Sequence, residues 1–85
     1  MAKKEFIYQK RYDYWDVSQT QLCWEYIVKI NINTLVEEYE GYAKCFYANG
    51  NLMREGNFKS GTRVGLWKKY DMDGLHKKNT YYLVD

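Results

Sequence analysis

The sequence predicts an all-β protein, an antiparallel meander of about six strands built from stacked β-hairpins. Three observations support this prediction. Apolar and polar residues alternate along several stretches, which is the period of a half-buried strand. Turn signals containing glycine separate these stretches. Aromatic residues, which favour strands, make up 19% of the chain, and proline is absent. At 85 residues the chain is expected to form a single domain with a thin core.

Composition and charge narrow the class of protein. Hydrophobic residues make up 46% of the chain, which excludes a disordered protein, and no apolar run is long enough for a transmembrane helix. The opening residues MAKKEFIYQK contain no apolar signal region, so we expect a cytoplasmic protein. Residues 1–42 carry five Lys/Arg against seven acids (−2), and residues 43–85 carry eight against four (+4). The basic bias is therefore mild.

The N-terminal part predicts two long strands. In Lys4–Tyr14 aromatic residues recur with period two, and the polar stretch Trp15–Thr20 ends the pattern. Gln21–Ile32 has the clearest alternation in the chain, and it is rich in β-branched and aromatic residues. We therefore expect it to form the central strand, with a bend or bulge because of its length.

Residues 33–40 are open to two interpretations. Thr34 and Glu37 have the spacing of a capping box, which predicts one short helical turn near 34–40. The alternative is a tight hairpin at Thr34-Leu35, although leucine is a poor residue for such a turn. We favour the hairpin because strand periodicity is the stronger kind of signal.

The hairpin has two consequences for neighbouring strands. It places favourable cross-strand pairs opposite each other, namely Lys29 with Glu40 and Ile30 with Tyr39. It also brings Cys23 and Cys45 into directly opposed or diagonal positions on adjacent strands. In a reducing cytosol we expect both cysteines to be reduced and to pack as small apolar residues.

The C-terminal half predicts a run of hairpins. Asn49-Gly50 is the strongest short signal for a hairpin turn, because both residues tolerate positive φ. Asp73-Gly74 is a second such turn, and Lys59–Thr62 is a third turn. The strands that these turns join are expected at Tyr39–Tyr47, Leu52–Phe58, Gly65–Tyr70 and Leu75–Val84.

An internal repeat is the most informative feature of the sequence. A shift of 24 residues aligns glycines and aromatic or basic residues in register. The aligned pairs are Gly41 with Gly65, Lys44 with Lys68, Phe46 with Tyr70, Gly50 with Gly74, and Phe58 with Tyr82. One hairpin cannot bury its own apolar face, so repeated hairpins are expected to stack side by side.

The repeat resembles the MORN repeat in its bacterial variant. The positions that carry the resemblance are Asn49-Gly50, Leu52, Gly56, Phe58-Lys59, Gly61, Gly65, Trp67 and Tyr70, and Asp73-Gly74-Leu75 begins another unit. The match covers about residues 40–76. It departs from the pattern at Val64, where a polar residue is usual, and one residue is missing between Gly74 and Leu75. We therefore divide the single domain into unmatched strands at 1–38 and a MORN-like hairpin array at 39–85.

The resemblance implies a meander of β-hairpins and a non-enzymatic role. Proteins with this repeat are similar to scaffolds, protein-binding modules and bacterial antitoxin or immunity proteins, and small inhibitors of this size occur in phage. The glycines and the asparagine of the repeat are interpreted as structural turn or packing positions. They are Gly41, Asn49, Gly50, Gly56, Gly61, Gly65 and Gly74.

The sequence offers no pattern for catalysis. His76 is the only histidine, and no nucleophile, base and acid have a spacing that suggests an active site. The acidic cluster of Glu37, Glu38 and Glu40 is interpreted as a solvated edge. We therefore expect no enzyme activity, no catalytic residue, no metal site and no cofactor.

Exposed aromatic residues are the leading candidates for binding. A small sheet holds more aromatic side chains than its core needs, and Tyr and Trp are typical anchors of protein interfaces. The partner is expected to be a protein, such as a toxin or an inhibited enzyme, or another copy of this chain through an edge strand. The candidates for partner contact are Tyr8, Tyr12, Tyr14, Trp15, Tyr42, Tyr47 and Trp67.

The alternative is binding to single-stranded nucleic acid or to an anionic surface. Basic residues are interleaved with aromatic residues in the second half of the chain, and this combination is typical of single-strand binding. The candidates are Arg54, Lys59, Arg63, Lys68, Lys69, Lys77 and Lys78.

Overall fold

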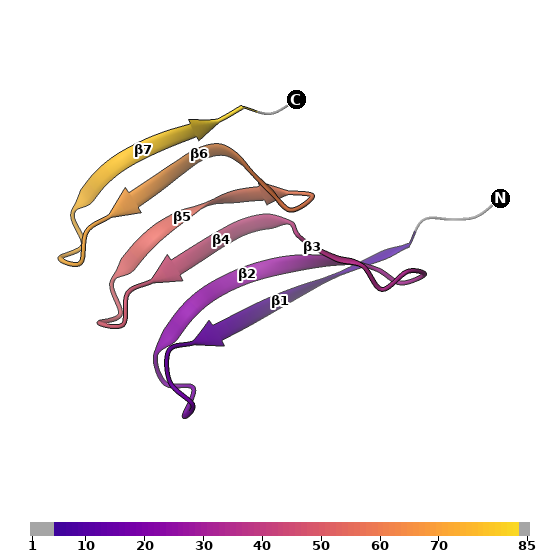
Figure 1. Ribbon diagram of the computed structural model, residues 1–85, viewed down its shortest axis with the longest axis horizontal. Helices are drawn as coiled ribbons and strands as arrows, with labels where there is room; N and C mark the ends of the chain where they lie inside the picture. Colours follow the sequence, from indigo (N-terminus) through magenta and orange to yellow (C-terminus); the bar gives the residue numbers. More distant parts are fainter. Residues whose placement is uncertain (1–4, 84–85) are drawn as a thin grey trace.

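The computed structural model describes residues 5–83, and it is all-β. Seven strands form one open antiparallel sheet, which Figure 1 shows as a curved meander. The order across the sheet is β1-β2-β4-β5-β6-β7, and the short β3 pairs with β2. Within the described range no helix is long and apolar enough to cross a membrane. The strands are β1 (Phe6–Tyr14), β2 (Leu22–Asn31), β3 (Glu37–Tyr39), β4 (Gly41–Phe46), β5 (Leu52–Lys59), β6 (Thr62–Tyr70) and β7 (His76–Tyr82).

The predicted meander of hairpins is confirmed. Each predicted strand overlaps an observed one, and the two N-terminal strands extend the same sheet as the repeat, because β2 pairs with β4. The strand predicted at 39–47 is interrupted, so β3 and β4 are separate elements. Two predicted strand ends, Lys4 and Val84, lie outside the described residues.

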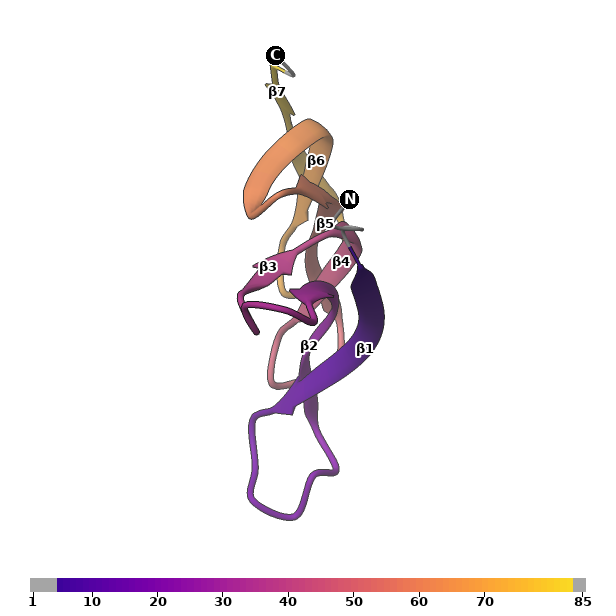
Figure 2. The same ribbon diagram turned by 90° about the vertical axis from the view of Figure 1, so that its right-hand side faces the viewer.

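The sheet has no second layer among the described residues. The molecule measures 53 × 36 × 11 Å, and Figure 2 shows the sheet from its edge as a single thin layer. A sheet normally buries one face against another element. Here the side chains of each face cover only one another, so four residues form the buried core: Val28, Ala43, Cys45 and Trp67.

Side-chain alternation divides the sheet into two chemically different faces. One carries a row of rings across the strands, and we call it the aromatic face; its reference residues are Tyr26, Tyr39, Phe58 and Trp67. The other carries residues of alternating charge, and we call it the charged face; its reference residues are Glu25, Lys44, Glu55 and Lys68.

Residues 32–35 form the turn of a hairpin between β2 and β3, and the helical turn that the capping-box pattern predicted near 34–40 is not present. The turn is longer than the tight one predicted at Thr34-Leu35, because the N–H of Asn31 donates to the carbonyl of Val36 at 3.0 Å. The Oδ1 of Asn31 accepts hydrogen bonds from the backbone N–H groups of Asn33 and Thr34, at 2.9 and 3.1 Å. The Glu37 carboxylate, which a capping box would direct back to Thr34, instead binds Arg11 at 2.5 Å. Leu35 takes a φ of 63°, the left-handed conformation that leucine disfavours.

The predicted register of this hairpin is correct for β4 and wrong by two residues for β3. Lys29 lies opposite Glu38, and Val28 lies opposite Tyr39. An irregularity between the two strands, where Gly41 has a φ of 89°, restores the predicted register from Trp24 and Cys45 onward. The predicted ion pair of Lys29 with Glu40 still forms, with Nζ and Oε1 3.7 Å apart.

The sequence repeat is also a structural repeat. The pair Gly41–Phe58 in β4–β5 corresponds to the pair Gly65–Tyr82 in β6–β7, at the same shift of 24 residues. The turns correspond as well. The backbone N–H of Tyr47 donates a hydrogen bond to the carbonyl of Asn51 at 2.8 Å, and the N–H of Asp71 donates one to the carbonyl of Leu75 at 2.9 Å. Both hairpins have a bulge at the same position. The second hairpin is therefore built like the first.

Gly56 differs from the other glycines of the repeat. The remaining five have positive φ values of 69–92° and occupy turn or bulge positions. Gly56 lies inside β5, where a Cβ atom would come within 2.3 Å of the Trp67 ring. Gly56 is therefore needed for close packing, because the indole ring lies directly over its Cα.

Candidate functional site

A continuous row of rings crosses the aromatic face. Centroids of Tyr26 and Tyr39 are 5.4 Å apart, those of Tyr39 and Phe58 are 4.9 Å apart, and those of Phe58 and Trp67 are 5.1 Å apart. The Arg63 guanidinium extends the row, 4.9 Å from the Trp67 ring centroid. Edge and tilted contacts of this kind are favourable, so the row supports the single-layered sheet.

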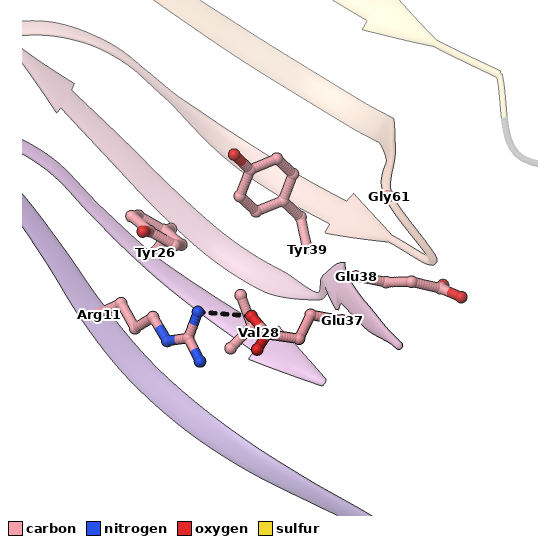
Figure 3. Close-up of a pocket in the computed structure, with 7 residues that line it drawn as sticks. All are labelled: Arg11, Tyr26, Val28, Glu37, Glu38, Tyr39 and Gly61. Carbon is pink, nitrogen blue, oxygen red and sulfur yellow. Dashed lines mark hydrogen bonds and ion pairs between the residues drawn. The ribbon is translucent and has the colours of Figure 1, made fainter. Parts of the chain in front are cut away.

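A shallow groove of about 370 Å³ runs beside this row. Figure 3 shows Tyr26 and Tyr39 along it, with Arg11 joined to Glu37 on the β1 side. Glu38 points away from this pair. A second hollow of about 290 Å³ shares Tyr26 and Tyr39, so the two form one surface across the middle strands.

Four polar side chains of this surface are already paired with one another. Arg11 and Glu37 neutralise each other, and the Tyr26 hydroxyl donates to the Asp13 carboxylate at 3.3 Å. Burial raises the pKa of Tyr26, and the charge and hydrogen bond of Asp13 raise it further. Sequence reasoning missed this surface because its residues come from strands far apart in the chain.

The charged face is organised around Glu55. A row of directly opposed residues reads Glu25, Lys44, Glu55, Lys68 across β2, β4, β5 and β6, so its charges alternate. The Tyr70 hydroxyl donates to Glu55 Oε2 at 2.6 Å, and the Tyr42 hydroxyl donates to Oε1. Burial acts to raise the pKa of Glu55, but the two hydroxyl donors and the nearby lysines outweigh it and hold the pKa below its usual value.

Glu55→Gln is expected to remove part of the acid sensitivity of the fold. A carboxyl whose pKa is depressed on folding stabilises the protein above its unfolded pKa, and this contribution is lost as pH falls through the folded pKa. The wild type should therefore lose its advantage over the variant as the pH falls below the usual pKa of a glutamate, about 4.3. Thermal unfolding at several pH values measures this.

Glu5→Gln is the matched control, since Glu5 is exposed and precedes the first strand. Its pH curve should follow the wild type. A difference between wild type and Glu55→Gln that stays constant with pH would contradict the role of Glu55.

The open edge strand β1 carries more exposed large apolar side chains than any other described strand. β1 pairs with β2 on one side, and no described residue pairs with its other side. Its large side chains are exposed, from 37% for Tyr14 to 64% for Tyr8. Its two cations turn inward: Lys10 lies 3.6 Å from Glu25, and Arg11 binds Glu37. Neither charge therefore stands over the open edge, where it would discourage pairing.

The structure separates the predicted partner-contact residues into three groups. Tyr8, Tyr12, Tyr14 and Trp15 lie together along β1 and the residue after it, and all four are exposed. Tyr42 is exposed on the charged face, where it binds Glu55. The other two side chains have structural contacts: Tyr47 donates its hydroxyl to the carbonyl of Tyr70 at 2.8 Å, and Trp67 is 4% exposed.

The predicted basic residues are also divided. Lys59 and Lys68 lie on the charged face, and Lys77 occupies the bulge of β7 between the paired positions 76 and 78. The other four converge on the aromatic face of β5–β7, beside Trp67 and Tyr82; they are Arg54, Arg63, Lys69 and Lys78.

The two cysteines are diagonal neighbours, as the hairpin predicted. Trp24, next to Cys23, lies opposite Cys45, and both thiols are free. Burial raises the pKa of each thiol. Cys45 packs in the core, with its Sγ 3.8 Å from the Sδ of Met53. Within residues 5–83 no cluster of three or more His, Cys, Asp or Glu side chains has the arrangement of a metal site.

No protein-family model, curated protein or solved structure matches this chain.

Proposed function

We propose that the protein is a non-enzymatic interaction module that binds a partner protein and inhibits it. The observation that carries the proposal is the exposed aromatic row along the open edge strand β1. An antitoxin, immunity or phage-inhibitor role is the form of this activity that the repeat resemblance suggests.

The edge of β1 supports binding by strand addition. An unpaired edge presents backbone N–H and C=O groups that an extended segment of a partner can pair with. β1 is nine residues long, well above the length that would blunt an edge. A partner strand would therefore obtain affinity from the backbone of β1.

The side chains of β1 support specificity. Phe6, Tyr8 and Tyr12 lie on the charged face of the sheet, with Tyr8 opposite Lys29 and Tyr12 opposite Glu25. Tyrosine supplies a large apolar area with a polar tip, and such residues dominate protein interfaces. A partner strand beside β1 would place its own side chains against this row.

The proposal is tested by capturing host proteins on three baits: wild type, Tyr8→Ser/Tyr12→Ser, and Tyr81→Ser/Leu83→Ser. The third bait is the matched control, since its two residues are exposed at the opposite edge, near and beyond the end of β7. We expect a protein that wild type and control retain at high salt and that the β1 variant loses. The captured protein, if an enzyme or toxin, should lose activity when wild type is added.

Two results would overturn the proposal. One is the same set of captured proteins on all three baits, and the other is no captured protein at all. Light scattering of the purified chain tests a further possibility. If the wild type is a dimer and the β1 variant is a monomer, the edge of β1 binds a second copy of the chain, and the proposal of a foreign partner is wrong.

A further inference from the structure

Three cations form an unbroken row on the aromatic face. Arg54 of β5 lies opposite Lys69 of β6, and Lys69 lies opposite Lys78 of β7. Neighbouring strands are about 4.8 Å apart, so the row spans about 10 Å. Like charges placed directly opposite each other destabilise a sheet. The arrangement is therefore unfavourable for the isolated fold and favourable for an anion placed above it.

The surroundings of the row strengthen this contrast. Arg63 borders the same hollow, together with Trp67, Lys68, Thr80 and Tyr82. The single acid of β5–β7, Glu55, is on the opposite face, where it lies between Lys44 and Lys68. The Nε of Arg54 is buried and has no hydrogen-bond partner among the described residues. Four cations thus lie together with no carboxylate on their side of these strands.

We propose that this cationic row binds an acidic, extended segment of a protein. The surface lies at the opposite edge of the sheet from β1, so it is a second site, independent of the strand-addition site. Carboxylates on a short segment can reach a row of this length and neutralise the opposed cations. The interaction is exposed, so its strength should fall as salt rises.

Two observations favour carboxylates of a protein segment over the backbone of a nucleic acid. Continued across the sheet, the row reaches Cys45, Trp24 and then Asp13, an acid on the same face that would repel a long polyanion. The neighbouring ring is also occupied: Trp67 is 4% exposed and Arg63 covers it at 4.9 Å. Single-strand binding depends on free ring faces for base stacking.

Fluorescence anisotropy tests the proposal with three labelled probes: an oligoglutamate peptide, an oligoglutamine peptide of the same length, and an oligothymidylate. We expect the wild type to bind oligoglutamate at low salt, to release it at high salt and to ignore oligoglutamine. Lys69→Gln/Lys78→Gln should weaken this binding about tenfold. Lys44→Gln/Lys59→Gln removes the same charge from the charged face, where neither residue borders the hollow, and should change the binding less than about twofold.

Circular dichroism checks that both variants remain folded. If both double variants lose binding to the same extent, net charge alone explains the binding and the proposed site is wrong. If oligothymidylate binds more tightly than oligoglutamate, the ligand of the row is a nucleic acid and the proposal of an acidic protein segment is wrong. No binding of oligoglutamate at low salt would also overturn the proposal, and none of these results bears on the β1 site.

Discussion

Trp67→Ala should cost the fold about 3 kcal/mol or more of its free energy of unfolding, the range measured for buried Trp-to-Ala changes. The indole is the largest of the four buried side chains and is 4% exposed. It contacts the Phe58 ring, supports Arg63 and donates its Nε1–H to the Asn57 carbonyl at 3.0 Å. A small single-layered domain has little stability to spare, so we expect the variant to be largely unfolded.

Denaturant unfolding followed by circular dichroism measures the effect. Trp67→Phe keeps a ring and loses the hydrogen bond to Asn57, so its loss should be nearer 1 kcal/mol. Trp15→Ala is the control at an exposed tryptophan, 49% exposed, and should cost less than Trp67→Ala. Equal losses for the two alanine variants would contradict the assignment of Trp67 to the core.

Gly56→Ala should be the second most damaging change, with a cost of about 1–3 kcal/mol or more from overpacking. The added Cβ would lie 2.3 Å from Cδ2 of Trp67, and the neighbouring ring atoms are 2.4 and 2.5 Å away. The indole cannot move aside without losing its contacts to Phe58 and Arg63.

Two variants separate this clash from an effect of losing any glycine. Gly65→Ala has no atom within 4 Å of its new Cβ, and only its φ of 69° should oppose it, at a cost of about 1 kcal/mol. Gly56→Ala should also be partly relieved by Trp67→Leu, so the double variant should be more stable than the sum of the two losses predicts. Strict additivity would be the contrary result.

Local patterns were sufficient to predict most of the fold. Strand alternation, Asn49-Gly50 and Asp73-Gly74 depend on neighbouring residues, and the structure has strands and turns where these signals lie. The predicted repeat of 24 residues is also present in the structure, because the hairpins β4–β5 and β6–β7 have the same strand register. The helical turn at 34–40 was the misleading local signal, because Glu37 binds Arg11 from a distant strand.

The surfaces could not be predicted in the same way, because they depend on non-local register. Trp67 reads as a contact residue in the sequence, but Gly56 on the adjacent strand leaves space for its ring to be buried. The cationic row requires the bulges of β6 with β5 and β7, which bring Lys69 opposite both Arg54 and Lys78. Adjacent lysines in the sequence, Lys68 and Lys69, therefore have opposite surroundings.

This contrast between adjacent lysines is the most direct test of the two-faced sheet. Lys69→Glu would place a carboxylate between Arg54 and Lys78, whereas Lys68→Glu would place one opposite Glu55. Both variants change the net charge equally. Opposed pairs contribute about 0.2–1 kcal/mol each, with the sign set by the charges.

Thermal unfolding of the two variants beside the wild type at neutral pH and low salt is the decisive measurement. We predict that Lys69→Glu raises the unfolding temperature and that Lys68→Glu lowers it, with both shifts reduced at high salt. Shifts of the same sign for the two variants would contradict the assignment of a cationic row to one face and an alternating charge row to the other.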